Sequence, residues 1–167
     1  ESREAALSLV SYAECQLEDK RFDEAKKVFA GFLKRFPESD VRYRAHFGMG
    51  WSDENLGSLK QAIASYRTVT YSTASPTAAR AQFQIGQCFV ASEDYRKAIV
   101  EFLKVSATYA YDDWNAKALL QVAGCFETLE DRENSAKYYR EVIAKYPSRD
   151  ESKLARERLS KLEVRRG

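Results

Sequence analysis

The stretch "AQFQIGQCFVASEDYRKAIVEFLKV", residues 81–105, decides the fold class. Small and aromatic residues recur in it three and four positions apart, and this pattern breaks once, at Ser92-Glu93-Asp94. Spacing of this kind places apolar side chains on one face of a helix. Asp or Ser at the break can cap the helix that follows. The stretch therefore predicts two helices joined by a short polar turn.

The same plan occurs four times along the chain. Aligning the copies on Ala25, Ala62, Ala98 and Ser135 gives steps of 37, 36 and 37 residues. Twelve positions earlier stand the small residues Ala13, Gly50, Gly86 and Ala123, and four positions later the aromatic residues Phe29, Tyr66, Phe102 and Tyr139. Because helices approach closely only where side chains are short, each small residue is expected to touch its second helix, beside the aromatic ring.

These columns resemble the tetratricopeptide repeat (TPR) family, whose pattern also matches the closing Pro37 and Pro147. The period is slightly longer than the family's usual one, and the second and third copies lack the proline. The resemblance implies an all-α fold, a right-handed superhelical solenoid of four TPR helical hairpins plus a C-terminal capping helix. The chain is expected to form one domain, 1–167, with repeats at 5–40, 41–76, 77–112 and 113–148 and the capping helix at 149–165.

Residues 149–165 are interpreted as a single amphipathic helix rather than a fifth copy. A stacked array needs a polar terminal helix, because its last repeat would otherwise expose an apolar face. The arginines of this segment could suggest a phosphate-binding tail, but interleaved Glu157 and Glu163 favour a solvated face; these arginines are Arg156, Arg158, Arg165 and Arg166.

Composition limits the partners and the compartment. The chain has 27 basic and 25 acidic residues, a net charge of +2, so no nucleic acid is expected. No apolar run is long enough for a membrane span. The phrases "RFPESDVRYRAHF" and "KYPSRDESKLA" are similar to the bacterial cell-envelope branch of the family, with its Tol-Pal-associated and outer-membrane-assembly lipoprotein members. This resemblance implies that the protein is located in the periplasm or cell envelope. Without the resemblance, we would expect a cytoplasmic location.

The chain opens on Glu1 rather than Met, and we interpret it as a processed chain or an excised domain. Its first residues do not have the pattern of a signal peptide, and we expect that any targeting segment has been lost from it.

Catalytic and metal chemistry are not expected. Cys15, Cys88 and Cys125 share one repeat column without a C-x-x-C motif, and His46 is the only histidine. Neighbouring first helices lie about 10 Å apart, too far for a disulfide, so the cysteines are expected to be buried core residues. The sequence predicts a protein that is not an enzyme and has no cofactor, no metal and no small-molecule substrate.

The family resemblance places partner binding on the concave side, which first helices line. The residues of this sequence at the lining positions of repeats two to four form the candidate partner-binding groove: Arg44, Phe47, Trp51, Arg80, Phe83, Gln84, Gln87, Lys117 and Gln121. A row of cations beside aromatic side chains favours a protein or peptide segment that is acidic or carries a carboxylate. Two alternatives stay open at this point. Phe47 and Phe83 could simply fill space between helices, and Arg44 could pair with Glu14 or Glu18.

The sequence therefore predicts a non-catalytic protein-interaction module or scaffold. The alternatives are a self-assembly segment of a larger multi-domain envelope protein and, from another class, a single-stranded RNA-binding array.

Overall fold

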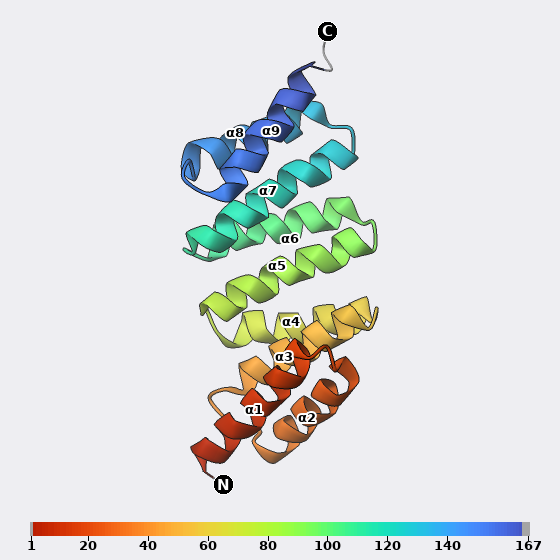
Figure 1. Ribbon diagram of the computed structural model, residues 1–167, viewed down its shortest axis with the longest axis vertical. Coiled ribbons are helices and arrows are strands. Elements are labelled where there is room, and N and C mark those ends of the chain that lie inside the picture. The colour runs from red at the N-terminus through yellow and green to blue at the C-terminus, as the bar shows by residue number, and fades with distance from the viewer. Residues whose placement is uncertain (1, 165–167) are drawn as a thin grey trace. The chain divides into compact units, whose positions relative to one another are not determined.

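The computed structural model describes residues 2–164, and the secondary structure of this part is entirely helical (Figure 1). The helices are α1 (Arg3–Glu18), α2 (Phe22–Arg35), α3 (Arg42–Asn55), α4 (Leu59–Ser72), α5 (Pro76–Ala91), α6 (Tyr95–Thr108), α7 (Asp112–Thr128), α8 (Arg132–Lys145) and α9 (Asp150–Val164). Four consecutive pairs and a final helix thus follow the predicted order, and the all-α helical-repeat fold is confirmed. Arg165 and Arg166 lie outside the described residues.

The chain divides into two compact units, one up to Gln84 and the other from Ile85 onward, so that α5 begins in the first unit and ends in the second. In the first unit α3 packs on both helices of the first pair and on α4. In the second unit α7 contacts α6 and α8, and α9 lies against α7 and α8. Each unit therefore repeats one arrangement, in which a first helix contacts its own second helix and the helix pair before it.

The turn inside each pair has the same backbone geometry in all four copies. A left-handed residue with φ near 60° or 78° occurs at Lys20, Gly57, Glu93 and Glu130. At the end of α7, the amide of Glu130 donates to the carbonyl of Glu127 and that of Asp131 to the carbonyl of Phe126. These paired bonds form a Schellman motif, which ends a helix by satisfying its last carbonyls. The predicted capping by Asp is confirmed at Asp94 and Asp131, whereas Ser58 makes no side-chain cap bond.

Glycines on the first helices lie directly against aromatic rings of second helices. A methyl group on Gly50 would lie 2.7 Å from the Tyr66 ring, and one on Gly86 would lie 2.5 Å from the Phe102 ring. On Gly48 it would overlap Phe29, which belongs to the preceding pair. These three rings are fully buried. The predicted contact between small residue and paired helix is therefore present, and Gly48 adds a second contact that joins successive pairs.

The last helix occupies the place of a first helix. Ser152, Ala155 and Leu162 of α9 are buried, and their counterparts 37 residues earlier are Asn115, Ala118 and Cys125, which are buried on α7. The opposite side of α9 is exposed and charged, with Lys153 and Arg156. The cap is thus a fifth first helix without a second helix among the described residues, a feature that the sequence interpretation did not anticipate.

We expect Gly48→Ala to lower the free energy of unfolding by about 1–3 kcal/mol, because the added methyl group overpacks a buried ring. Gly31→Ala is the matched control. It lies inside α2 with no heavy atom within 4 Å of the added methyl group, so it should stabilise the protein by about 0.5–1 kcal/mol. Urea unfolding of both variants gives the comparison, and equal effects at the two positions would contradict the close approach.

Replacing Glu130 by Gly should raise the melting temperature, because a left-handed backbone costs a non-glycine residue about 1–2 kcal/mol. Gly57→Ala should lower it by the same mechanism, since Gly57 occupies the equivalent turn with φ 78°. Thermal unfolding followed by circular dichroism measures both shifts. Shifts of the same sign in the two variants would show that the turn backbone does not decide them.

Candidate functional site

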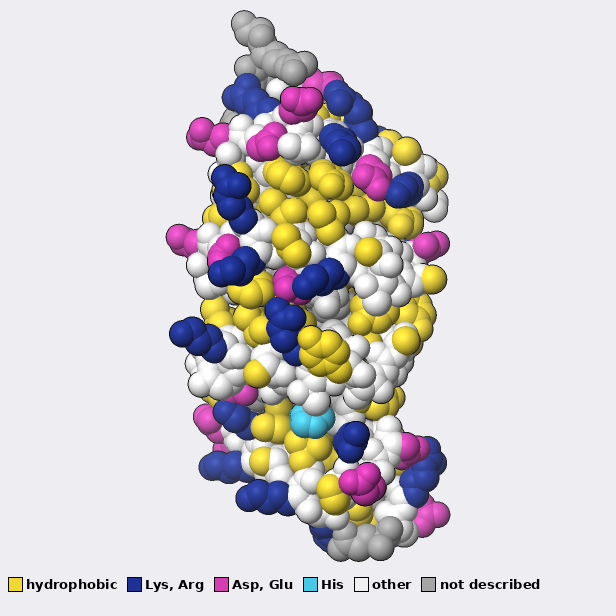
Figure 2. Space-filling model, turned by 180° about the vertical axis from the view of Figure 1, so that it is seen from behind, with side chains coloured by type: hydrophobic (Ala, Val, Ile, Leu, Met, Phe, Trp, Pro, Cys, Tyr) yellow, Lys and Arg dark blue, Asp and Glu magenta, His cyan; other side chains and the backbone are white. Residues whose placement is uncertain are grey.

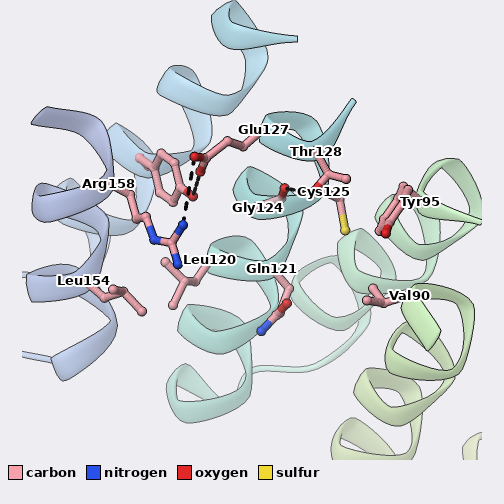
Figure 3. A pocket seen from close by; sticks show the side chains of 11 residues that line it. Val90, Tyr95, Leu120, Gln121, Gly124, Cys125, Glu127, Thr128, Leu154 and Arg158 are labelled. Atoms are coloured by element: carbon pink, nitrogen blue, oxygen red, sulfur yellow. Dashed lines mark hydrogen bonds and ion pairs between the residues drawn. The ribbon is translucent and has the colours of Figure 1, made fainter. Parts of the chain in front are cut away.

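A cleft of about 510 Å³ crosses the first helices of the second unit. Leu154 and Arg158 line it from α9, Leu120 and Gln121 from α7, and Val90 from the end of α5 (Figure 3). Apolar and polar groups thus face the same recess. Its volume falls within the range of natural ligand pockets.

The cleft lies on the repeat columns that were assigned to the groove from the sequence. Leu154 is the counterpart of Lys117, and Arg158 is the counterpart of Gln121, each 37 residues later. Of the predicted residues in this unit, Gln121 lines the cleft and Lys117 does not. The Lys117 side chain is exposed, with its ammonium 4.8 Å from the centre of the Trp114 ring. Gln87 is half-buried and is not part of the cleft lining.

Arg158 was interpreted from the sequence as a solvated capping side chain; it is exposed on α9, and the structure adds that it borders the cleft. Its side chain is about half exposed at the cleft, and its guanidinium lies 3.9 Å from the Glu127 carboxylate. Glu127 in turn accepts a hydrogen bond of 2.8 Å from the Tyr139 hydroxyl. Burial and the neighbouring carboxylate raise the pKa of Tyr139, so this hydroxyl stays a proton donor at neutral pH.

The first unit contains the same arrangement two copies earlier. The Tyr66 hydroxyl donates to Glu54 over 2.7 Å, and the Gln84 amide donates to the same carboxylate over 2.9 Å. Where the second helix carries Phe instead, at Phe29 and Phe102, the acidic position holds Leu17 or Val90. A buried tyrosine hydroxyl needs a hydrogen-bond partner, which explains the alternation. Glu and Tyr twelve residues apart in the second and fourth copies are the sequence signal for these pairs, although the repeat columns alone did not predict them.

An arginine of α5 covers the predicted aromatic residues of α3. The guanidinium of Arg80 lies 4.8 Å from the centre of the Phe47 ring and 4.5 Å from that of Trp51. Burial lowers the pKa of Arg80, which still remains charged at neutral pH. Phe47 is only 7% exposed and packs on Tyr66, while Trp51 is partly buried against the core of the first pair. This cation–π contact joins α3 to the first part of α5, which belongs to the same unit.

The two alternatives left open by the sequence have structural answers. Phe47 and Phe83 are both 7% exposed, as the space-filling role requires. Arg44 pairs with Glu14 of α1 through two hydrogen bonds of 2.9 and 2.5 Å. That contact raises the pKa of Arg44. The expected row of cations therefore consists of one ion-paired arginine, one arginine stacked on aromatic rings and one exposed lysine.

Two of the cysteines are buried as expected, and the expectation is wrong for Cys15. Cys88 and Cys125 lie in the core, whereas Cys15 is exposed on α1, where no described helix pair covers it. Burial raises the pKa of the Cys125 thiol to about 11, although this side chain borders the cleft. Burial and Arg42 lower the pKa of His46. Among residues 2–164, no cluster of three His, Cys, Asp or Glu side chains is placed to hold a metal.

At pH 8 we expect one fast thiol in the native protein, that of Cys15. With a pKa of about 11, only about one Cys125 side chain in a thousand is a thiolate, the reactive form, at pH 8. Labelling with a chromogenic disulfide should therefore give one rapid equivalent, lost in Cys15→Ser, and three equivalents in denaturant. Rapid labelling of Cys125 in the Cys15→Ser variant would contradict this assignment and point to an activated nucleophile.

The family model for the tetratricopeptide repeat matches residues 8–39 and 117–149, which cover the first and fourth helical pairs. No curated protein matches the chain at a significant level. None of the helices in the described range is long and apolar enough to cross a bilayer.

Similar solved structures share the fold at low identity. A tetratricopeptide repeat protein from Parabacteroides merdae superimposes with a TM-score of 0.78 at 11% identity, over 97% of this chain and 61% of that one. The apo form of RapI gives 0.80 at 12% identity, over 95% and 48%. PilW, a type IV pilus biogenesis factor, gives 0.73 at 17% identity, over 89% and 66%. The chain thus spans about half to two thirds of the length of these three.

The first and fourth helical pairs thus match the tetratricopeptide repeat, and the chain as a whole shares the fold of solved tetratricopeptide repeat proteins.

Proposed function

We propose that the protein is a non-catalytic interaction module that binds an extended segment of another protein along its first helices. The observation that carries this proposal is the cleft over α7, because it combines apolar walls with polar groups that can recognise a peptide. The fold supports the broader statement that this is a protein-interaction scaffold. The envelope location rests on PilW alone among the similar structures described above and stays part of the proposal.

The chemistry of the cleft defines the segment that fits it. Leu120 and Leu154 offer contact to an apolar side chain, and Gln121 can bond to a peptide backbone. Arg158 is held only loosely by Glu127, at 3.9 Å, so its guanidinium can turn to a carboxylate of the partner. We therefore propose a segment with one apolar anchor next to an acidic side chain or a terminal carboxylate, with Lys117 as a further cation at its end.

In the first unit, the predicted groove residues offer a partner no cation comparable to Arg158. Arg44 and Arg80 are already engaged within the unit. We propose that the part of Trp51 that the core and Arg80 leave exposed gives a partner an apolar contact there rather than a free charge.

Single-stranded RNA binding is the alternative from another class. Figure 2 shows one face of the molecule, on which basic and acidic side chains are interspersed among hydrophobic ones. The near balance of 27 basic and 25 acidic residues agrees with this distribution. Binding driven by phosphate contacts needs an excess of cations and weakens steeply with salt. A titration with single-stranded RNA at two salt concentrations therefore separates the two functions.

Selection of random peptides displayed on phage tests the proposal without a known partner. We expect the enriched peptides to share an acidic residue beside an apolar one. Replacing Arg158 by Ala should weaken their binding about tenfold, since a charge-assisted bond contributes about 1.5–3 kcal/mol. Arg156→Ala, on the exposed side of the same helix, is the matched control and should leave binding unchanged. Equal losses in both variants, or no enriched peptides, would overturn the proposed cleft specificity.

A further inference from the structure

One position on the first helices holds a different side chain in each copy, namely Glu14, Trp51, Gln87 and Gly124. In the first unit this side chain reaches the next first helix. Glu14 lies 2.5 Å from the Arg44 guanidinium of α3. The centre of the Trp51 ring lies 4.5 Å from the Arg80 guanidinium of α5. In both cases the position supplies a side chain that covers its neighbour, and in the fourth copy Gly124 supplies none.

The packing of the helices does not require a glycine at position 124. A methyl group on Gly50 or Gly86 would overlap a buried aromatic ring, whereas one on Gly124 would meet no heavy atom within 4 Å. Glycine inside a helix is less stable than alanine, so the fold gains nothing from it here. Gly31 has the same open surroundings, but Gly124 differs from it because it lines the cleft. The missing side chain therefore leaves space inside the cleft.

The walls of this space are apolar. On α9 the counterpart of Arg80 is Leu154, which is 41% exposed. On α7 the counterpart of Phe47 is Leu120, which is partly buried against the core of the second unit. Figure 3 shows the side chains of Leu120 and Leu154 pointing toward each other from α7 and α9, close to Gly124. The recess thus offers apolar contact on two sides.

We propose that an aromatic side chain of a partner protein fills the space over Gly124, packed between Leu120 and Leu154. This inference rests on the proposed function of the cleft and names the anchor that the bound segment carries. In the first unit the Trp51 ring packs edge-on against Phe47, with the ring centres 6.1 Å apart. The partner's ring repeats that packing from outside the chain. A short aliphatic side chain would leave part of the space empty and lose those contacts.

A further second helix packed on α9 would not take this place. On α7, which α8 covers, the positions equivalent to Leu154 and Arg158 hold Lys117 and Gln121. Lys117 remains exposed there and Gln121 remains partly exposed. A paired second helix therefore leaves these positions open, and a bound segment can reach them.

Titration with 3-methylindole, the side chain of tryptophan, tests the space directly by NMR of labelled leucine methyl groups. We expect saturable shifts of the Leu120 and Leu154 signals. Binding should weaken at least about tenfold in Gly124→Trp, which fills the space from within, and in Gly124→Gln, whose side chain the third copy carries at Gln87. Gly31→Ala is the control and should keep the shifts, and thermal unfolding shows whether each variant is folded. Absence of saturable shifts in the unchanged protein, or full binding by either folded Gly124 variant, overturns the inference.

The phage selection separates this inference from the proposed function. Enriched peptides should carry Trp, Phe or Tyr beside the acidic residue, and Gly124→Gln should weaken their binding at least about tenfold. Peptides that depend on Arg158 but carry aliphatic anchors, and that bind Gly124→Gln equally well, would overturn the aromatic anchor and leave the proposed function standing. Saturable binding of 3-methylindole without any enriched peptide would support the aromatic site and overturn the proposed peptide cleft.

Discussion

The structure depends on the close approach of an aromatic ring on each second helix to a residue without a bulky side chain on its first helix. Gly50 under Tyr66 and Gly86 under Phe102 show this contact within a pair, and Gly48 under Phe29 shows it between successive pairs. Because protein interiors are packed without spare volume, these contacts fix how far apart the helices lie. They thereby fix which side chains of the first helices remain on the surface where the cleft forms.

Once the helix spacing is fixed, equivalent positions can hold different chemistry. Between the first and second pairs, the buried carboxylate of Asp53 accepts a 2.5 Å contact from Lys26. The same two positions between the third and fourth pairs hold Ile99 and Phe126, which are apolar. The Tyr–Glu pairs behave alike, since they replace a Phe and an aliphatic residue in alternate copies. In each case both partners change together, because a buried polar group is costly when its partner is absent.

The need of charged groups for a partner also distinguishes arginines that can bind another protein from arginines whose partner lies within the chain. Arg44 and Arg80 have the charge that a groove requires, yet a carboxylate and two aromatic rings of the first unit already use it. Arg158 keeps only a loose contact with Glu127 and borders the cleft.

The repeat period, the helix pairs and the small and aromatic columns could be predicted from the sequence, because they depend on spacing along one chain. The columns of the candidate groove came from the resemblance to the family, and their role in binding stays a prediction. Which cations stay available could not be predicted, since it depends on which side chains of neighbouring helices come within hydrogen-bonding distance. The exposure of Cys15 and the place of Arg158 likewise required the tertiary structure. A column shows which way a residue faces, whereas only the packed neighbours decide whether anything covers it.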